Sequence, residues 1–101
     1  MLQITIRPEA EEDLIKSWVY IAQDNPKAAD SLYEAAQKTF GKLAGMPGMG
    51  AVYLSKNPQL TGLRFFPVKE FKKYFIFYRC SKSEIEIIRV LRAGRDFKNI
   101  L

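Results

Sequence analysis

The spacing of hydrophobic positions changes along this chain and predicts strands near both ends with helices between them. Residues 2–6 alternate apolar and polar side chains, which indicates a half-buried strand. Apolar residues then recur on one face along residues 8–24 and again along 26–43, at the spacing of amphipathic helices. Asn25, an N-cap residue followed by a proline, marks the start of the second helix. We therefore expect the two helices to form an antiparallel hairpin.

The second half of the chain is rich in Phe, Ile, Val and Tyr and breaks into three short runs. After a loop that contains several Gly and Pro residues, we expect strands at 63–68, 74–80 and 84–91, joined by two polar turns. This order of elements predicts an α+β fold, with the helix hairpin packed on one face of a mainly antiparallel four-stranded sheet that the first strand completes. No linker interrupts the chain, so residues 1–101 are predicted to form a single domain.

Composition adds a positive charge and removes several kinds of chemistry. Hydrophobic residues make up 48% of the chain, and 16 Lys and Arg against 11 Asp and Glu give a net charge of +5, which favours an acidic partner. The chain has no histidine, which excludes Ser–His and Cys–His nucleophilic schemes, and neither a metal site nor a cofactor is expected. Cys80, the single cysteine, is predicted to be a buried and inert thiol. With neither a membrane span nor a secretory signal, a cytoplasmic protein is expected.

The arginines of the C-terminal part are the main candidates for function. They are Arg64, Arg79, Arg89, Arg92 and Arg95. On the predicted last strand, Arg89 and Arg92 should point to opposite faces, and Arg95 follows just past the strand. Arginine binds carboxylates and phosphates through two parallel hydrogen bonds, so we expect the group to contact a target. The alternative for any one of them is a structural ion pair or a solvated charge.

The first helix supplies two further interpretations. Glu11, Glu12 and Asp13 lie near its start, where acidic side chains favour the helix dipole, so capping and solvation are preferred over catalysis. Trp18 lies on the apolar stripe of the same helix. Core packing is the favoured interpretation of this residue, and a partner-binding groove is the alternative.

These patterns resemble the ParE/RelE superfamily of bacterial toxins, and the ParE branch more than the RelE branch. The resemblance covers nearly the whole chain and is carried by ITIRPEAEEDLIKSWVYIA, KLAGMPGMG, LRFFPV and KYFIFYRCSKSEIEIIRVLRAGRD. ParE-like chains typically close with Leu-His-Gly-Ala-Arg-Asp. Residues 91–96 match this motif except that Arg92 replaces the histidine and Ala-Gly replaces Gly-Ala.

The resemblance implies a small cytoplasmic toxin of a plasmid-stabilisation module, held inactive by a ParD-like antitoxin with an acidic C-terminal segment. ParE-type members inhibit DNA gyrase, whereas RelE-type members cleave mRNA on the ribosome with Lys, Arg and Tyr side chains. We expect a protein-binding gyrase inhibitor because the RelE catalytic tyrosine would fall at Leu101, which has no hydroxyl. The alternatives are a ribosome-dependent endoribonuclease that uses Arg64, Arg89 and Arg95, or a member that only binds an antitoxin.

Two sets of site residues follow from these expectations, and neither implies a membrane or sequence-specific DNA contact. We expect the target to be bound by Arg89, Arg92 and Arg95. So small a domain cannot bury all its apolar helix side chains, so an amphipathic helix of the antitoxin should lie against those left exposed. The expected antitoxin-binding residues are Trp18, Ile21, Leu32 and Tyr33.

Overall fold

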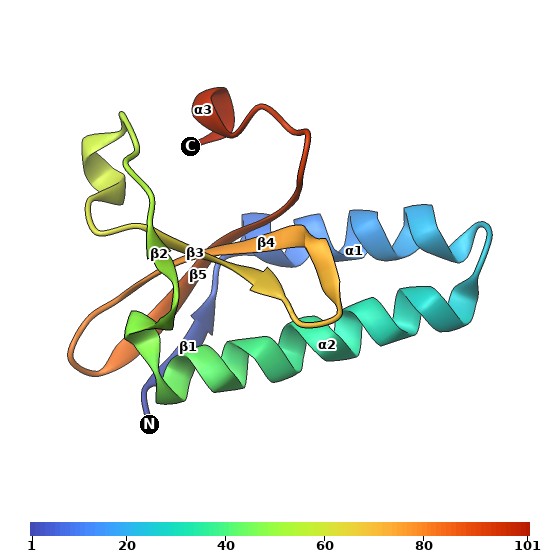
Figure 1. Cartoon of the computed structure of the whole chain (residues 1–101), viewed down its shortest axis with the longest axis horizontal. Coiled ribbons are helices and arrows are strands. Elements are labelled where there is room, and N and C mark those ends of the chain that lie inside the picture. Colours follow the sequence, from blue (N-terminus) through green and yellow to red (C-terminus); the bar gives the residue numbers. More distant parts are fainter.

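The computed structural model describes residues 1–101 and places a helix hairpin against one face of a five-stranded sheet. Figure 1 shows the hairpin turn projecting beyond the strands, with the C-terminal helix on the other side of the strands from α2. The main elements are β1 (Gln3–Ile6), α1 (Pro8–Ala22), α2 (Pro26–Gly45), β2 (Ala51–Val52), β3 (Arg64–Val68), β4 (Phe71–Cys80), β5 (Glu84–Arg92) and α3 (Phe97–Ile100). Two short 3₁₀ turns, Pro47–Met49 and Pro58–Leu60, lie in the connection from α2 to β3.

The strand order β1-β5-β4-β3-β2 confirms the predicted α+β fold and adds one strand to it. β1 runs parallel to β5, and every other pair is antiparallel. The additional strand, β2, is only two residues long and pairs with Phe65 and Arg64 of β3. A strand this short has no detectable alternation in sequence, which is why this segment was expected to be a loop.

Side-chain and backbone caps fix where both long helices begin. The Asn25 side chain accepts a hydrogen bond from the backbone N–H of Ala28 at 3.1 Å, as expected for an N-cap, and Pro26 follows as the first helical residue. α1 begins without such a side-chain cap. Instead, the N–H of Arg7 donates to the carbonyl of Ile87 at 3.0 Å, so the start of α1 is tied directly to β5.

Hydrophobic residues fill two separate cores because successive strand residues face opposite sides of the sheet. The hairpin-side core contains Leu14, Leu32 and Phe40 packed with strand residues such as Ile76 and Ile87. The second core lies on the opposite face of the sheet. The sequence did not predict the segments that cover it. It contains Leu60, Leu63, Phe77, Ile88, Leu91 and Leu101, flanked by Tyr53, Phe65, Phe75, Phe97 and Ile100.

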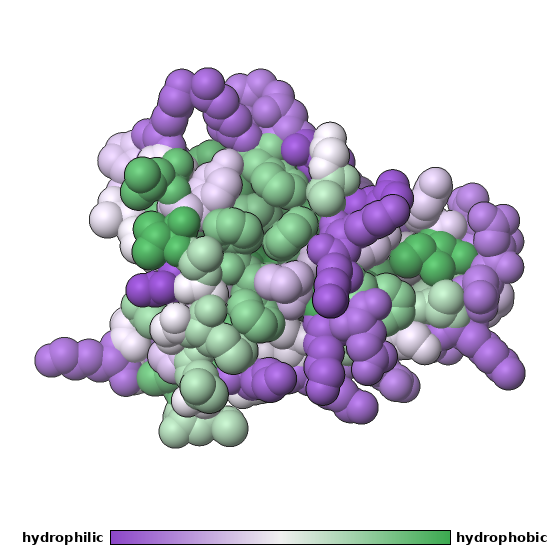
Figure 2. All heavy atoms as spheres, in the orientation of Figure 1, coloured by the Kyte–Doolittle hydropathy of each residue, from purple (hydrophilic) through white to green (hydrophobic).

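The second core is covered by the 53–63 segment and by α3. Phe97 packs edge-on against Phe77, with ring centroids 5.0 Å apart, and Tyr53 does the same at 5.4 Å. The Ser55 hydroxyl donates to the carbonyl of Leu101 at 2.5 Å and so holds the end of the chain against this segment. Figure 2 shows apolar residues reaching the surface in this part of the molecule.

Two details of the strands differ from the sequence prediction. A register shift between Phe77 and Tyr78 of β4 leaves Ile88 of β5 without a paired residue on β4 and interrupts the alternation of faces. Cys80 is exposed, which contradicts the prediction of a buried thiol. The reason is its place at the last residue of β4, next to the exposed residues 81–83 and beyond the buried segment 76–78.

The Glu86 carboxylate of β5 links Arg79 of β4 to Arg7, which lies between β1 and α1. It accepts from Arg7 Nε at 2.8 Å and from Arg79 Nε at 2.9 Å. Partial burial acts to raise the pKa of Glu86, but the hydrogen bonds from both arginines outweigh it and hold the pKa below its ordinary value. The bridge therefore joins the junction of β1 and α1 to β5 and β4.

This bridge predicts a stability loss in acid. Because the Glu86 pKa is lower in the folded protein than in the unfolded chain, its contribution is present above the ordinary Glu pKa of about 4.3 and is lost as the pH falls through the lower, folded value. Glu86→Gln should therefore reduce stability near neutral pH and flatten its dependence on acid pH. Urea unfolding at a series of pH values measures this, and an unchanged pH profile in the variant would contradict the assignment.

Gly50 marks a close crossing between the segment after α2 and the sheet. Its N–H donates to the Tyr78 hydroxyl at 2.9 Å, and that hydroxyl donates to the carbonyl of Pro47 at 2.7 Å. Burial raises the pKa of Tyr78, which favours the protonated hydroxyl that this donor role needs. A Cβ at position 50 would lie 2.8 Å from Cε1 of Tyr78 and 2.9 Å from the Phe65 carbonyl oxygen, closer than packed atoms tolerate.

Gly50→Ala should therefore lower the free energy of unfolding by about 1–3 kcal/mol, because the added methyl overpacks a rigid crossing. Gly41→Ala is the matched control, since Gly41 lies within α2 and a Cβ there meets nothing within 4 Å. We expect this control to gain about 0.5–1 kcal/mol from its better helix propensity. Urea denaturation of both variants compares the two effects, and equal stability would disprove the close crossing.

Candidate functional site

α1 carries different kinds of side chain on its different sides. Ala10 and Leu14 are buried in the hairpin-side core. A second apolar set lies on an exposed side of the helix, because Trp18 and Val19 follow Ile15 by three and four residues. The exposed fractions of Ile15, Trp18 and Val19 are 51%, 37% and 49%. The single apolar stripe predicted from the sequence is thus two stripes, one facing the sheet and one facing outward.

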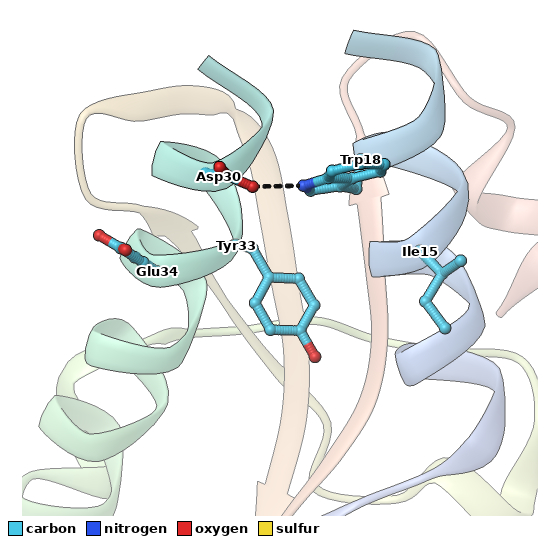
Figure 3. Close-up of a pocket in the computed structure, with 5 residues that line it drawn as sticks. All are labelled: Ile15, Trp18, Asp30, Tyr33 and Glu34. Carbon is cyan, nitrogen blue, oxygen red and sulfur yellow. Dashed lines mark hydrogen bonds between the residues drawn. The ribbon is translucent and has the colours of Figure 1, made fainter. Parts of the chain in front are cut away.

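Two residues of the outward stripe, Ile15 and Trp18, form one wall of a groove between α1 and α2, which we call the α1–α2 groove. It encloses about 380 Å³ and is lined by Ile15, Trp18, Asp30, Tyr33 and Glu34. Figure 3 shows the Trp18 indole reaching across to Asp30, with the Tyr33 ring between the two helices and Glu34 directed away. The walls are apolar, whereas the α2 rim carries two carboxylates.

The polar ends of the two aromatic residues in this groove are held by hydrogen bonds. Trp18 Nε1 donates to Asp30 Oδ1 at 2.8 Å (Figure 3), and the Tyr33 hydroxyl donates to Glu11 Oε1 at 2.8 Å. The bond to Glu11, together with some burial, raises the pKa of the Tyr33 hydroxyl. The rings are therefore fixed in place with apolar surface open to a partner.

The predicted antitoxin-binding residues divide among three places. Trp18 and Tyr33 line the α1–α2 groove. Ile21 is half-buried on the other flank of α1, beside Phe71. Leu32 is 1% exposed and belongs to the core, so its assignment to a binding surface is wrong; its side of α2 faces the sheet. The sequence prediction omitted Ile15 from this set, although its spacing of three residues from Trp18 pointed to it.

Asp13 and Arg89 form the central ion pair of the molecule. Arg89 Nε donates to Asp13 Oδ2 at 2.7 Å and Nη2 donates to Oδ1 at 2.8 Å, in two parallel bonds. Oδ2 also accepts from the backbone N–H of Val90 at 3.0 Å. Because Arg89 donates these hydrogen bonds to Asp13, the pKa of its guanidinium is raised above the ordinary value. Asp13 is only 9% exposed, so the expectation that it is solvated is wrong, and Arg89 is not a free side chain for a target.

Two other candidate arginines also have partners within the chain. Arg64 Nη1 donates to the Gly50 carbonyl at 2.6 Å, and Arg79 contacts Glu86 and the carbonyl of Gln59. Arg64 lies on β3, two strands away from β5, so it is not gathered with the C-terminal arginines as a ribonuclease site would require. The pair between Arg79 and Glu86 is the structural ion pair that the sequence left open as an alternative, whereas Arg64 bonds to a backbone carbonyl.

Arg92 and Arg95 differ from the other three because both are exposed and neither makes an ion pair or a side-chain hydrogen bond. They line a hollow of about 210 Å³ between α1 and the end of β5. Tyr20, Tyr74 and Arg92 also line a second hollow of about 530 Å³, so the two hollows adjoin at these residues. We call the combined surface the basic groove; its main lining residues are Lys16, Ser17, Tyr20, Ile21, Phe71, Lys72, Lys73, Tyr74, Arg92 and Arg95.

A family model described as the ParE toxin of the type II toxin–antitoxin system parDE matches residues 4–97. The chain belongs to the ParE toxin family. The ParE/RelE resemblance is thereby confirmed, and so is the toxin–antitoxin module to which ParE toxins belong, with an antitoxin of the ParD kind as partner.

A solved ParE-type structure supports the fold. The structure titled "Chromosomal ParDE TA system from P. aeruginosa" matches with a TM-score of 0.72 and 21% identity, over 93% of this chain and 98% of that chain. At this identity the match supports the fold alone. No curated protein shows a significant match.

The structure contains no group of three or more Cys, Asp or Glu residues placed to hold a metal ion. Neither long helix of this ParE family member is apolar enough to cross a membrane.

The ion pair between Asp13 and Arg89 predicts strong coupling in a double-mutant cycle. Asp13→Ala leaves the Arg89 charge and the Val90 N–H without partners in a largely buried place, and should cost about 2–3 kcal/mol of unfolding free energy. Arg89→Ala should cost a similar amount, and the double variant should cost clearly less than the sum. Glu12→Ala is the control for loss of an ion pair as such. Its bond to Lys16 lies on the surface, so its removal should change the free energy of unfolding little. Additive losses in urea denaturation would refute the coupling.

Proposed function

We propose that this ParE family member acts in the cytoplasm as a non-enzymatic inhibitor of DNA gyrase, and that a ParD-like antitoxin neutralises it. The observation that carries the antitoxin part is the α1–α2 groove, where Ile15, Trp18 and Tyr33 offer apolar surface that the core does not cover. Exposed apolar grooves of this kind accept the apolar face of an amphipathic helix.

The charges at the rim of the groove define the helix that fits it. Asp30 and Glu34 border the groove on α2, and Glu11 holds Tyr33 beside it. A helix that docks here should present apolar residues to the groove and neutral or basic residues to this rim. The acidic segment of an antitoxin is repelled by the same carboxylates and does not belong in the groove.

The chain end supports gyrase inhibition over cleavage of mRNA. Leu101 has no hydroxyl and is buried in the second core, on the face of the sheet opposite the hairpin. Position 101 therefore provides no general acid or base beside Arg92 and Arg95, which lie in the basic groove. We propose that these two arginines contact the target, with Arg89 as a positioning residue held by Asp13.

The test of the target is a direct comparison of two activities. The purified protein should block supercoiling by DNA gyrase, while mRNA isolated from cells in which it is induced should remain intact. Specific cleavage of mRNA without gyrase inhibition would contradict the proposal and favour the endoribonuclease alternative.

Trp18→Lys tests the antitoxin site. The added charge places an ammonium group in the apolar groove beside Asp30 and should weaken binding of the antitoxin encoded next to this toxin about tenfold or more. Val19→Lys is the matched control, because Val19 is 49% exposed on the same helix but lines neither groove. Titration calorimetry compares the complexes, with circular dichroism to confirm folding. Equal weakening by both variants would argue against the α1–α2 groove.

A further inference from the structure

The basic groove lies on the flank of α1 that faces away from α2. Lys16 and Tyr20 are four residues apart and share one side of the helix, whereas Ile15 and Trp18 face the α1–α2 groove. The two grooves share no lining residue. A ligand in the basic groove is therefore recognised by side chains that are separate from those proposed for the antitoxin helix.

The positive charge of this groove is largely uncompensated. Arg92 and Arg95 have no carboxylate partner, and Lys16 pairs only with Glu12 in a bond that is mostly exposed and therefore weak. Two carboxylates line the groove. The charge of Asp13 is taken by Arg89, and Glu70 lines the groove together with Lys72, Lys73 and Arg92. Such a surface attracts anionic groups, and the free arginine forks match carboxylates or phosphates.

The interior of the groove distinguishes between these anionic ligands. Its wider part is bordered by apolar residues, Ile21 and Phe71, directly beside the lysines and Arg92. Single-stranded nucleic acid requires exposed aromatic faces on which bases stack. Tyr74 is only 8% exposed and Phe71 is half-buried, which leaves Tyr20 as the single exposed ring. An extended peptide in which apolar side chains alternate with carboxylates matches this surface better. Its apolar side chains can pack on Ile21 and Phe71, while its carboxylates bind the arginine guanidinium groups.

We propose that the basic groove binds an acidic peptide segment with interleaved apolar side chains, and that this segment belongs to the protein that the toxin inhibits. The inference rests on the proposed function and adds the chemistry of the target segment that Arg92 and Arg95 recognise. The acidic rim of the α1–α2 groove directs such a segment to this flank of α1.

A labelled synthetic peptide in which Glu and Asp alternate with Leu and Phe tests the groove on the full chain. Fluorescence anisotropy should show binding that weakens as salt is added. Arg92→Ala combined with Arg95→Ala should weaken it about tenfold or more. Lys38→Ala combined with Lys42→Ala removes the same charge from exposed positions of α2 and should leave it within about twofold. Trp18→Lys should also have little effect, because Trp18 lines the other groove.

Three results would overturn the inference. The first is equal loss of binding in the arginine and lysine double variants, which would indicate attraction to net charge alone. The second is tighter binding of a single-stranded oligonucleotide than of the peptide at the same sites. The third is full growth arrest by an arginine double variant that no longer binds the peptide. Peptide binding through Arg92 and Arg95 without inhibition of gyrase would support the groove and contradict only the proposed target.

Discussion

The contact between Asp13 and Arg89 is the interaction on which the arrangement of this toxin depends. β1 pairs with β5 only as far as Ile87, after which the chain leaves the sheet and enters α1. In the second turn of α1, the Asp13 carboxylate binds the Arg89 guanidinium and the Val90 N–H. A side chain of α1 thereby continues the contact with β5 beyond the last residue of β1. A largely buried charge pair of this kind is costly to break, so it fixes how the helix lies across the sheet.

Once α1 is held in this way, its remaining sides form two surfaces of different chemistry. Trp18 faces α2 and helps to form an apolar groove with an acidic rim. Tyr20 faces the ends of β4 and β5 and helps to form a groove with unpaired arginines. The engagement of Arg89 by Asp13 also cancels the acidic charge that would otherwise lie beside Arg92. The same pair therefore positions the helix and leaves the basic groove positive.

The sequence predicted the fold well because the regular spacing of apolar residues in long segments indicates both the type of secondary structure and the face that is buried. The Asn25 cap and the alternation in β4 and β5 placed those elements to within a few residues. β2 and the second core were missed, since two-residue strands and loop packing have no periodic signal. The site was predicted less well. Leu32 and Trp18 belong to similar apolar patterns, and only the position of α1 on the sheet makes one buried and the other exposed. No sequence pattern indicated that Arg89 pairs with Asp13, because the two residues are 76 positions apart in the chain.

The most direct test of two separate surfaces on α1 is an amide NMR map of the toxin titrated with an acidic–apolar peptide. The account predicts shifts along the basic groove, at Lys16, Tyr20, Lys73 and Arg92, while the indole N–H of Trp18, the only tryptophan, stays where it is. Movement of the Trp18 indole signal in step with the basic groove would contradict the account, because it would mean that the two flanks of α1 act as one site.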